Sequence, residues 1–135
     1  MSIEDNKAIV EKVYEAASSQ EHHIIDELVD DNYKRHALNS TDILIGRDRF
    51  KSNINARFTT KTIVAEGDIV MSYRVIDGTH DKEYLGVSPT GKSFHVSHIS
   101  IERVVDGKLV EGWGLVDNLS FFQQVGVLPI DLSSR

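Results

Sequence analysis

The sequence contains no cysteine and only two prolines among its 135 residues. Without cysteine there are no disulfides, thiolate metal sites or cysteine nucleophiles. Long apolar runs are also missing: no stretch approaches the roughly 18 residues of a membrane-spanning helix. The opening segment, MSIEDNKAIVEK, lacks the basic start and apolar run of a signal peptide. We therefore expect a cytoplasmic protein with no membrane partner.

Basic residues are scarce relative to acidic ones. Lys and Arg number 15 against 21 for Asp and Glu, which gives a net charge of -6. Because nucleic-acid binding relies on clustered basic side chains, this balance argues against a nucleic-acid partner. No repeat, low-complexity tract or Pro/Gly/Ser-rich linker divides the chain. With 40% hydrophobic residues, the composition predicts a single globular domain over residues 1–135.

Helical patterns come first along the chain. Apolar residues recur at helical spacing over residues 9–17, with Asp5 or Asn6 as a possible cap, and a short second helix is expected over 24–29. The segment GRDRFKSNINARF reads as a third helix beginning near Arg47. These helices would supply one layer of the fold.

Strand patterns follow from Thr60 onward. Two β-branched runs flank the hairpin signal 66–68, and two longer strands flank Asp106-Gly107, the strongest short hairpin signal in the chain. A last helix follows, with Gly126 placed to end it. We predict an α+β fold, a curved antiparallel sheet with N-terminal helices packed over a deep pocket.

Three basic residues are expected to have structural rather than catalytic roles. Arg74, in the middle of a predicted strand, is most simply an ion-pair partner. Lys34 and Arg35 are expected to lie at a solvated edge.

The segment WGLVD raises the main chemical question. Strand side chains alternate, so Trp113, Leu115 and Asp117 share one face. If that face is concave and covered by helices, desolvation raises the pKa of Asp117 above the ~3.9 of a free Asp and suits it to proton transfer. A carboxylate at a strand-to-helix junction is equally suited to be a helix N-cap. Trp113 likewise has two possible roles, as a core residue or as a platform for a ligand.

The histidines are scattered. On one strand Phe94, Val96 and His98 share a face, whereas His95 points to the other. This divergence rules against a His-x-x-His chelate, and we predict no metal site. Taken singly, His36, His80 and His98 are more often loop or core histidines than catalytic ones.

The residues from Gly78 to Pro129 resemble the SnoaL-like polyketide cyclase family, within the nuclear transport factor 2-like and ketosteroid-isomerase-like superfamily. The shared parts are the Gly-Thr-His turn running into Leu85-Gly86 and Pro89-Thr90-Gly91, the Asp-Gly-Lys hairpin, and Trp-x-x-x-Asp followed by Gln124-x-Gly126. The resemblance extends more weakly to residues 6–38. It implies a cone-shaped α+β barrel with a deep pocket and a reaction without cofactor or metal.

The resemblance also implies roles for individual residues. Asp117 matches the aspartate that abstracts the proton alpha to an ester carbonyl before an intramolecular aldol addition. His80 and His36 match family histidines that would either line the pocket mouth or hold its loops, and Trp113 matches the tryptophan of a pocket wall. His98 departs from the family pattern, yet it would be placed to contact an enolate oxygen or to orient Asp117. We predict that Asp117, His98 and His80 are catalytic and that the substrate-binding set is Trp113, His36, Tyr14 and Phe94.

These observations favour a cofactor-independent cyclase or isomerase-type enzyme that acts on a small hydrophobic carbonyl ligand. The alternatives are a non-catalytic ligand-binding or dimerisation domain of the same fold, or a hydrolase or hydroxylase using the same pocket. Because the exposed face of such a sheet usually pairs with another copy, a homodimer or homotetramer is expected.

Overall fold

The computed structural model describes residues 2–38, 40–51 and 55–129. Its elements, in chain order, are α1 (Ile3–Ser19), α2 (His22–Leu28), β1 (Val29–Ala37), β2 (Ile43–Ile45), the 3-10 helix η1 (Asp48–Lys51), β3 (Asn55–Glu66), β4 (Ile69–Thr79), β5 (Ser93–Val105), β6 (Lys108–Val116) and α3 (Asn118–Gln124). None of the helices among the described residues is long and apolar enough to cross a membrane.

The first helix begins with a capping box. The Ser2 hydroxyl accepts from the Asp5 N–H, and the Asp5 carboxylate accepts from the Ser2 N–H, so two otherwise unpaired donors are satisfied. The predicted cap was therefore wrong by a few residues: Ser2 is the N-cap, and Asp5 completes the box. The buried stripe of α1 comprises Asn6, Ile9, Val10, Val13, Tyr14, Ala16 and Ala17.

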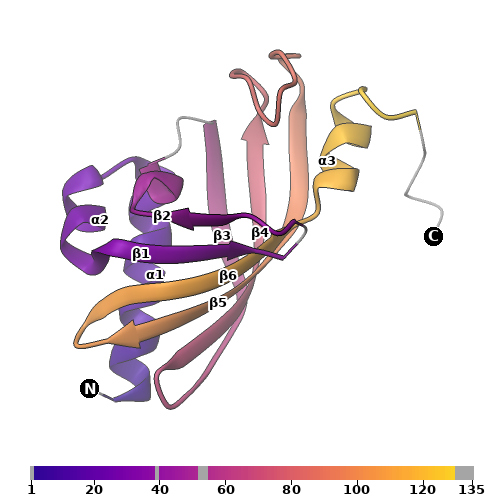
Figure 1. The fold of residues 1–135 in the computed structure, drawn as a ribbon. Helices are drawn as coiled ribbons and strands as arrows, with labels where there is room; N and C mark the ends of the chain where they lie inside the picture. Colours follow the sequence, from indigo (N-terminus) through magenta and orange to yellow (C-terminus); the bar gives the residue numbers. More distant parts are fainter. Residues whose placement is uncertain (1, 39, 52–54, 130–135) are drawn as a thin grey trace.

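The six strands form one curved sheet in the order β2-β1-β6-β5-β4-β3. Strands β3 to β6 are an antiparallel meander, as predicted, whereas β1 runs parallel to β6 and makes the sheet mixed. Helix α1 lies behind the sheet in Figure 1, where it packs mainly against β3. The predicted α+β fold with a curved sheet and covering helices is confirmed.

The predicted turns and the predicted third helix had different outcomes. Both hairpins form, and Asp106 and Gly107 have φ values of 51° and 79°, the positive values that a type I′ turn requires. The third helix is wrong: only η1 forms, and β3 begins at Asn55, while residues 52–54 lie outside the described part. Exposure alternates along β3 with the period of a strand, which the helical interpretation overlooked.

The two faces of the sheet differ sharply. On β5, Phe94, Val96, His98, Ser100 and Glu102 are buried on the inner face, and His95 points outward, as the alternation predicted.

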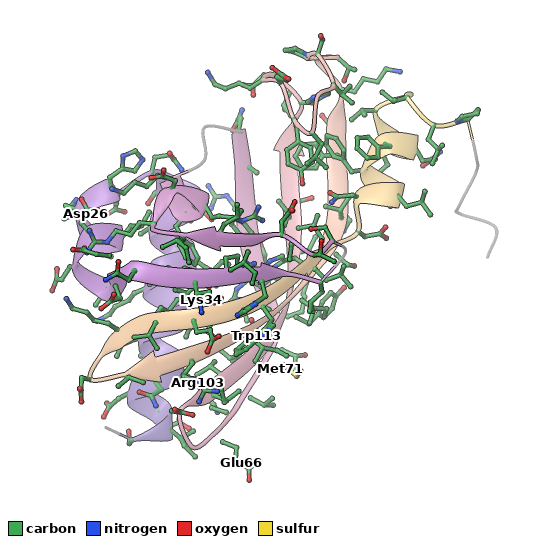
Figure 2. All side chains as sticks on the ribbon, viewed as in Figure 1. Asp26, Lys34, Glu66, Met71, Arg103 and Trp113 are labelled. Atoms are coloured by element: carbon green, nitrogen blue, oxygen red, sulfur yellow. The ribbon has the colours of Figure 1, made fainter. Side chains whose placement is uncertain are left out.

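On β6 the inner face carries Gly112, Gly114 and Val116. Trp113 lies on the outer face, near Met71 on β4, and both are visible on the front of the sheet in Figure 2. The expectation that the tryptophan faces a concave pocket is therefore wrong.

Candidate active site

A cavity of about 400 Å³ lies between the inner face of the sheet, α1, η1 and α3. Apolar and aromatic side chains make up most of its wall: Tyr14, Ala17, Phe50, Ala56, Phe58, Ile76, Tyr84, Phe94, Val96, Val116 and Phe121. The remaining lining residues are Arg35, Asp48, Arg49, His98 and Asn118. A mostly apolar cavity with a few polar groups is the usual form of a small-molecule site.

His98 is the polar group deepest in the wall. Only 2% of the residue is exposed, and its ring lies 5.7 Å from the Tyr14 ring and 5.5 Å from the Phe58 ring. Burial, reinforced by Arg35 and then by the other nearby arginines, lowers the pKa of His98 from 6.5 to about 3. The imidazole is therefore neutral at physiological pH. Its Nδ1 is buried and has no hydrogen-bond partner among the described residues.

An ion pair lies beside this imidazole. Glu102 on β5 is fully buried and accepts hydrogen bonds from the hydroxyls of Tyr14 (2.9 Å) and Tyr33 (2.5 Å). Arg35 on β1 is 4% exposed, and its Nη1 donates to Glu102 Oε2 at 3.2 Å. Burial raises the pKa of Glu102, while Arg35 and the two hydroxyl donors oppose that shift. Three donors converging on one carboxyl group identify it as a carboxylate.

Two glycines make room for this ion pair. A Cβ added at Gly112 would overlap Tyr33 Oη and Glu102 Oε1, and one added at Gly114 would overlap Arg35 Nη2. The inner face of β6 therefore lacks side chains where the charged groups sit. The alternation in EGWGLV reflects this packing, with the tryptophan turned outward.

A second arginine supports the cavity from behind. Arg74 pairs with Glu11 at 2.7 Å, and its guanidinium lies 3.8 Å from the centre of the Tyr14 ring. The prediction that Arg74 is an ion-pair partner is confirmed. At the α3 end of the cavity, the Tyr84 hydroxyl donates to Asn118 Oδ1 at 2.9 Å.

Of the seven predicted site residues, the structure brings three to the cavity. Tyr14, Phe94 and His98 line it together. Phe94 also packs against Phe121 of α3, with ring centres 4.9 Å apart. The other four lie elsewhere.

Asp117 is the N-cap of α3. Its Oδ1 accepts from the Ser120 N–H at 3.1 Å, and Asp117 is not among the residues that line the cavity. Its neighbours Val116 and Asn118 line the cavity instead, because the inner face of β6 belongs to the glycines and Val116. Asp117 therefore does not lie in the apolar recess that was considered for it, and its catalytic role stays a prediction.

His80 anchors a loop. Its side chain is fully buried, the Thr90 N–H donates to its Nδ1 at 3.3 Å, and its ring packs edge-on against Phe121. His80 is not among the cavity-lining residues. This arrangement ties the segment between β4 and β5 to α3, so the side chain holds the loop in place.

Trp113 and His36 form a pair on the outer face. Their rings stack with centres 5.0 Å apart and an interplanar angle of 10°, and His36 Nε2 lies 2.8 Å from Glu111 Oε2. Neither ring lines the cavity. The strand face that carries them is the convex one, away from the cavity, and their role in substrate binding stays a prediction.

Arg35 and Glu102 were missed from the sequence. Arg35 was expected at a solvated edge, but β1 is not an edge strand: it lies between β2 and β6. The alternation was readable in part, since Tyr33 and Arg35 share parity on β1 and Glu102 shares parity with His98 on β5. Nothing in the sequence pairs these two strands with each other across β6.

Comparison with known proteins places the chain in a family. The family described as SnoaL-like polyketide cyclase matches residues 7–125. The chain belongs to the SnoaL-like polyketide cyclase family. No curated protein matches the sequence.

Solved structures agree with membership of the SnoaL-like family. IdmH from Streptomyces antibioticus, a candidate polyketide cyclase, is 28% identical with a TM-score of 0.76 over 90% of this chain and 99% of its own. AclR from Streptomyces galilaeus, a candidate hydroxylase, is 23% identical with a TM-score of 0.82 over 98% and 88%. An epoxide hydrolase from M. tuberculosis is 13% identical with a TM-score of 0.73 over 91% and 90%. The last two show the fold alone.

Among the described residues, no group of three or more His, Asp or Glu side chains is arranged to hold a metal ion. The polar groups among the residues that line the SnoaL-like cavity are imidazole, guanidinium, carboxylate, amide and phenol hydroxyl groups.

Proposed function

We propose that this chain is a cofactor-independent cyclase or isomerase-type enzyme that acts on a hydrophobic carbonyl substrate. The observation that carries the proposal is a neutral imidazole, His98, which lines a largely aromatic cavity and whose buried Nδ1 has no partner among the described residues. A buried ring nitrogen without a hydrogen-bond partner is costly to maintain. In the proposed reaction its lone pair receives the acidic proton alpha to the carbonyl of the bound substrate. Membership of the cyclase family supports the same reaction class.

The proposed reaction begins with proton transfer to His98. Nδ1 takes the proton alpha to a carbonyl, and the resulting enolate carbon attacks a second carbonyl carbon of the same molecule. The new alkoxide then takes the proton back from the imidazolium. A proton flanked by carbonyl groups is already acidic, so a positioned base and a folded substrate supply most of the barrier reduction.

The low pKa of His98 is compatible with this role. An imidazolium at His98 is disfavoured by burial and by the positive charge of Arg35. The same positive charge favours a negative charge on the substrate, and the enolate and imidazolium attract each other at contact. The two effects of Arg35 on the proton transfer therefore largely cancel.

Asp117 remains the alternative base within the same proposal. Its Oδ1 is used as a helix cap, and its position next to Val116 and Asn118 puts it beside the cavity wall. We assign the first proton transfer to His98 because it lines the cavity and Asp117 does not.

The test is hydrogen–deuterium exchange at the alpha carbons of 2-tetralone, a bicyclic aromatic ketone, followed by proton NMR in D2O. We expect the wild-type protein to accelerate exchange and His98→Gln to reduce that acceleration by about 100-fold or more. Asp117→Asn should stay within a few-fold of wild type, because an Asn side chain also caps a helix.

Two outcomes would redirect the proposal. Loss of exchange in Asp117→Asn with retention in His98→Gln would make the aspartate the base. Tight binding of 2-tetralone by the wild type without accelerated exchange would favour a ligand-binding domain over an enzyme.

We further propose that two copies associate through the outer sheet face. Val64, Met71, Ile101 and Trp113 form one cross-strand row on that face, in register over four strands. Met71 is 43% exposed and Val64 53%, and a contiguous apolar face of this kind typically marks a protein contact. Sedimentation should give a dimer or tetramer that Met71→Lys dissociates. A wild-type monomer at micromolar concentration would contradict this.

A further inference from the structure

The proton transfer proposed above involves no direct contact between the substrate and the buried cluster of Arg35, Glu102, Tyr14 and Tyr33. This cluster lies at the cavity wall, because Arg35 and Tyr14 line the cavity while Glu102 lies behind them and is fully buried. Burial of an ion pair costs free energy that mutual attraction rarely exceeds, so stability alone is weak grounds for keeping one. The cluster calls for a role toward the ligand.

The guanidinium of Arg35 is held from one side only. Every hydrogen bond that the structure records for it among the described residues leaves from Nη1, toward Tyr14 Oη (3.4 Å), Tyr33 Oη (3.2 Å) and Glu102 Oε2 (3.2 Å). A guanidinium has five N–H donors, so Nη2 and Nε retain theirs. Nη2 occupies the space that Gly114 leaves empty on β6.

This cluster holds the guanidinium in one orientation. The Glu102 carboxylate accepts a hydrogen bond from the guanidinium. The hydroxyls of Tyr14 and Tyr33 each donate to one of the two carboxylate oxygens and so hold the carboxylate in place. Donors whose orientation is set before the reaction stabilise a developing negative charge without reorganising, and their effect is larger in a site from which water is excluded.

We propose that Arg35 binds the oxygen anion of the enolate and that Glu102, Tyr14 and Tyr33 are its positioning residues. The inference rests on the proposed function, since it names the group that receives the negative charge formed by the proton transfer to His98. It predicts that the cavity prefers flat aromatic or carbonyl compounds whose oxygen carries a negative charge over neutral compounds of the same shape.

Other charged groups also face the cavity, and their effect on a bound anion has to be distinguished from that of Arg35. Arg49 and Asp48 of η1 line it, and both residues are exposed. Arg74 lies behind Tyr14 and is paired with Glu11. Because exposed charges are screened by water and salt, the contribution of Arg49 to a buried anion should be smaller than that of Arg35.

The experiment compares 4-nitrophenol, whose neutral and ionised forms differ in absorbance, with nitrobenzene, its neutral analogue. In wild-type protein we expect the pKa of bound 4-nitrophenol to fall by at least about one unit, which means at least tenfold tighter binding of the ionised form. The variant is Arg35→Gln combined with Glu102→Gln, which removes both buried charges together and leaves neither unpaired.

In the double variant we expect the pKa of bound 4-nitrophenol to rise to its value in water or above it, because burial disfavours the ionised form, with nitrobenzene affinity within about twofold of wild type. Arg49→Gln is the matched control and should leave most of the wild-type shift in place. Tyr33→Phe should give a smaller loss than the double variant, as a positioning residue would.

The outcomes separate the two proposals. If nitrobenzene binds and the bound pKa of 4-nitrophenol is the same in wild type and the double variant, Arg35 is not the anion-binding group, and the cavity itself stands. If Arg49→Gln removes the shift and the double variant keeps it, the anion site belongs to η1, which also overturns the inference. If wild type binds neither compound, the proposed function fails together with it.

Discussion

Strand β1 carries a residue paired with a glutamate on each face of the sheet, and the two pairs have different surroundings. On the inner face Arg35 pairs with Glu102 at 3.2 Å, and the side chains are 5% and 0% exposed. On the outer face His36 pairs with Glu111 at 2.8 Å, with exposures of 25% and 29%. The outer pair is shorter, yet water is available to both of its members.

The distance between the paired atoms therefore does not by itself indicate how costly the loss of one partner is. In a buried pair, loss of one partner leaves a charge with no solvent to replace it, whereas an exposed pair exchanges its partner for water. The inner face therefore holds groups whose removal is costly, next to the cavity. The outer face holds apolar and half-exposed groups suited to contact with another copy.

The largest expected effect comes from removing a carboxylate on each face. Glu102→Ala leaves Arg35 charged and buried and takes the acceptor from two tyrosine hydroxyls, so the free energy of unfolding should fall by about 3–5 kcal/mol. Glu111→Ala, the matched change outside, should cost about 1 kcal/mol or less. Urea unfolding of both variants measures the difference, and equal losses would abolish the distinction between the two faces.

A glycine substitution probes the space beside Arg35. Gly114→Ala places a Cβ where Nη2 lies, and the guanidinium cannot move freely because Glu102 holds it. Overpacking of this kind costs about 1–3 kcal/mol. The control Leu115→Ala, on the outer face, should cost less. Thermal unfolding of the two variants measures the difference in stability. An unchanged melting temperature for Gly114→Ala would mean that the inner face is loosely packed.

Acidic pH should act on the inner face through His98. The pKa of His98 is about 3 in the folded protein and 6.5 in the free group. Between these two pH values the unfolded chain binds a proton at His98 that the native protein does not bind. Stability is then lost as pH falls from 6.5 toward 3. The loss from pH 7 to pH 5 should be about 2 kcal/mol larger in wild type than in His98→Gln. Parallel pH profiles for the two proteins would contradict a buried neutral imidazole.

The smallest effect concerns Asp117, at the end of the outer-face register. As the N-cap of α3 it should lose about 1 kcal/mol on change to Ala and almost nothing on change to Asn. Chemical denaturation of the two variants gives the values. A similar loss in Asp117→Asn would show that the charge, and not the capping hydrogen bond, is what matters there.

Side-chain alternation was predictable from the sequence, but not which face looks inward. The parity of Phe94 and His98 was correct, and so was that of Trp113 and Leu115. The tryptophan, the largest side chain of its strand, suggested the inner face. The structure puts glycines there because the long side chains of Arg35 and Glu102 fill the space from neighbouring strands, and such pairing across strands leaves no local pattern.

The helices and strands were likewise predictable only where the signal is local in the sequence. Both hairpins and α3 were found because their turn and cap residues are local signals. Strand β1 and its parallel pairing with β6 were missed, since residues far apart in sequence form it. The segment after Arg47 was read as a helix because Phe50 and Phe58 suit either period.

A nitrogen-15 NMR spectrum of the His98 side chain, recorded with and without 2-tetralone at pH 6, examines the proposed proton-transfer group itself. We expect a neutral imidazole whose Nδ1 signal shifts when the ketone binds and whose shift is absent in His98→Gln. A protonated imidazole at pH 6, or a signal that ignores a bound ketone, would contradict the claim that His98 is the proton-transfer group of the cavity.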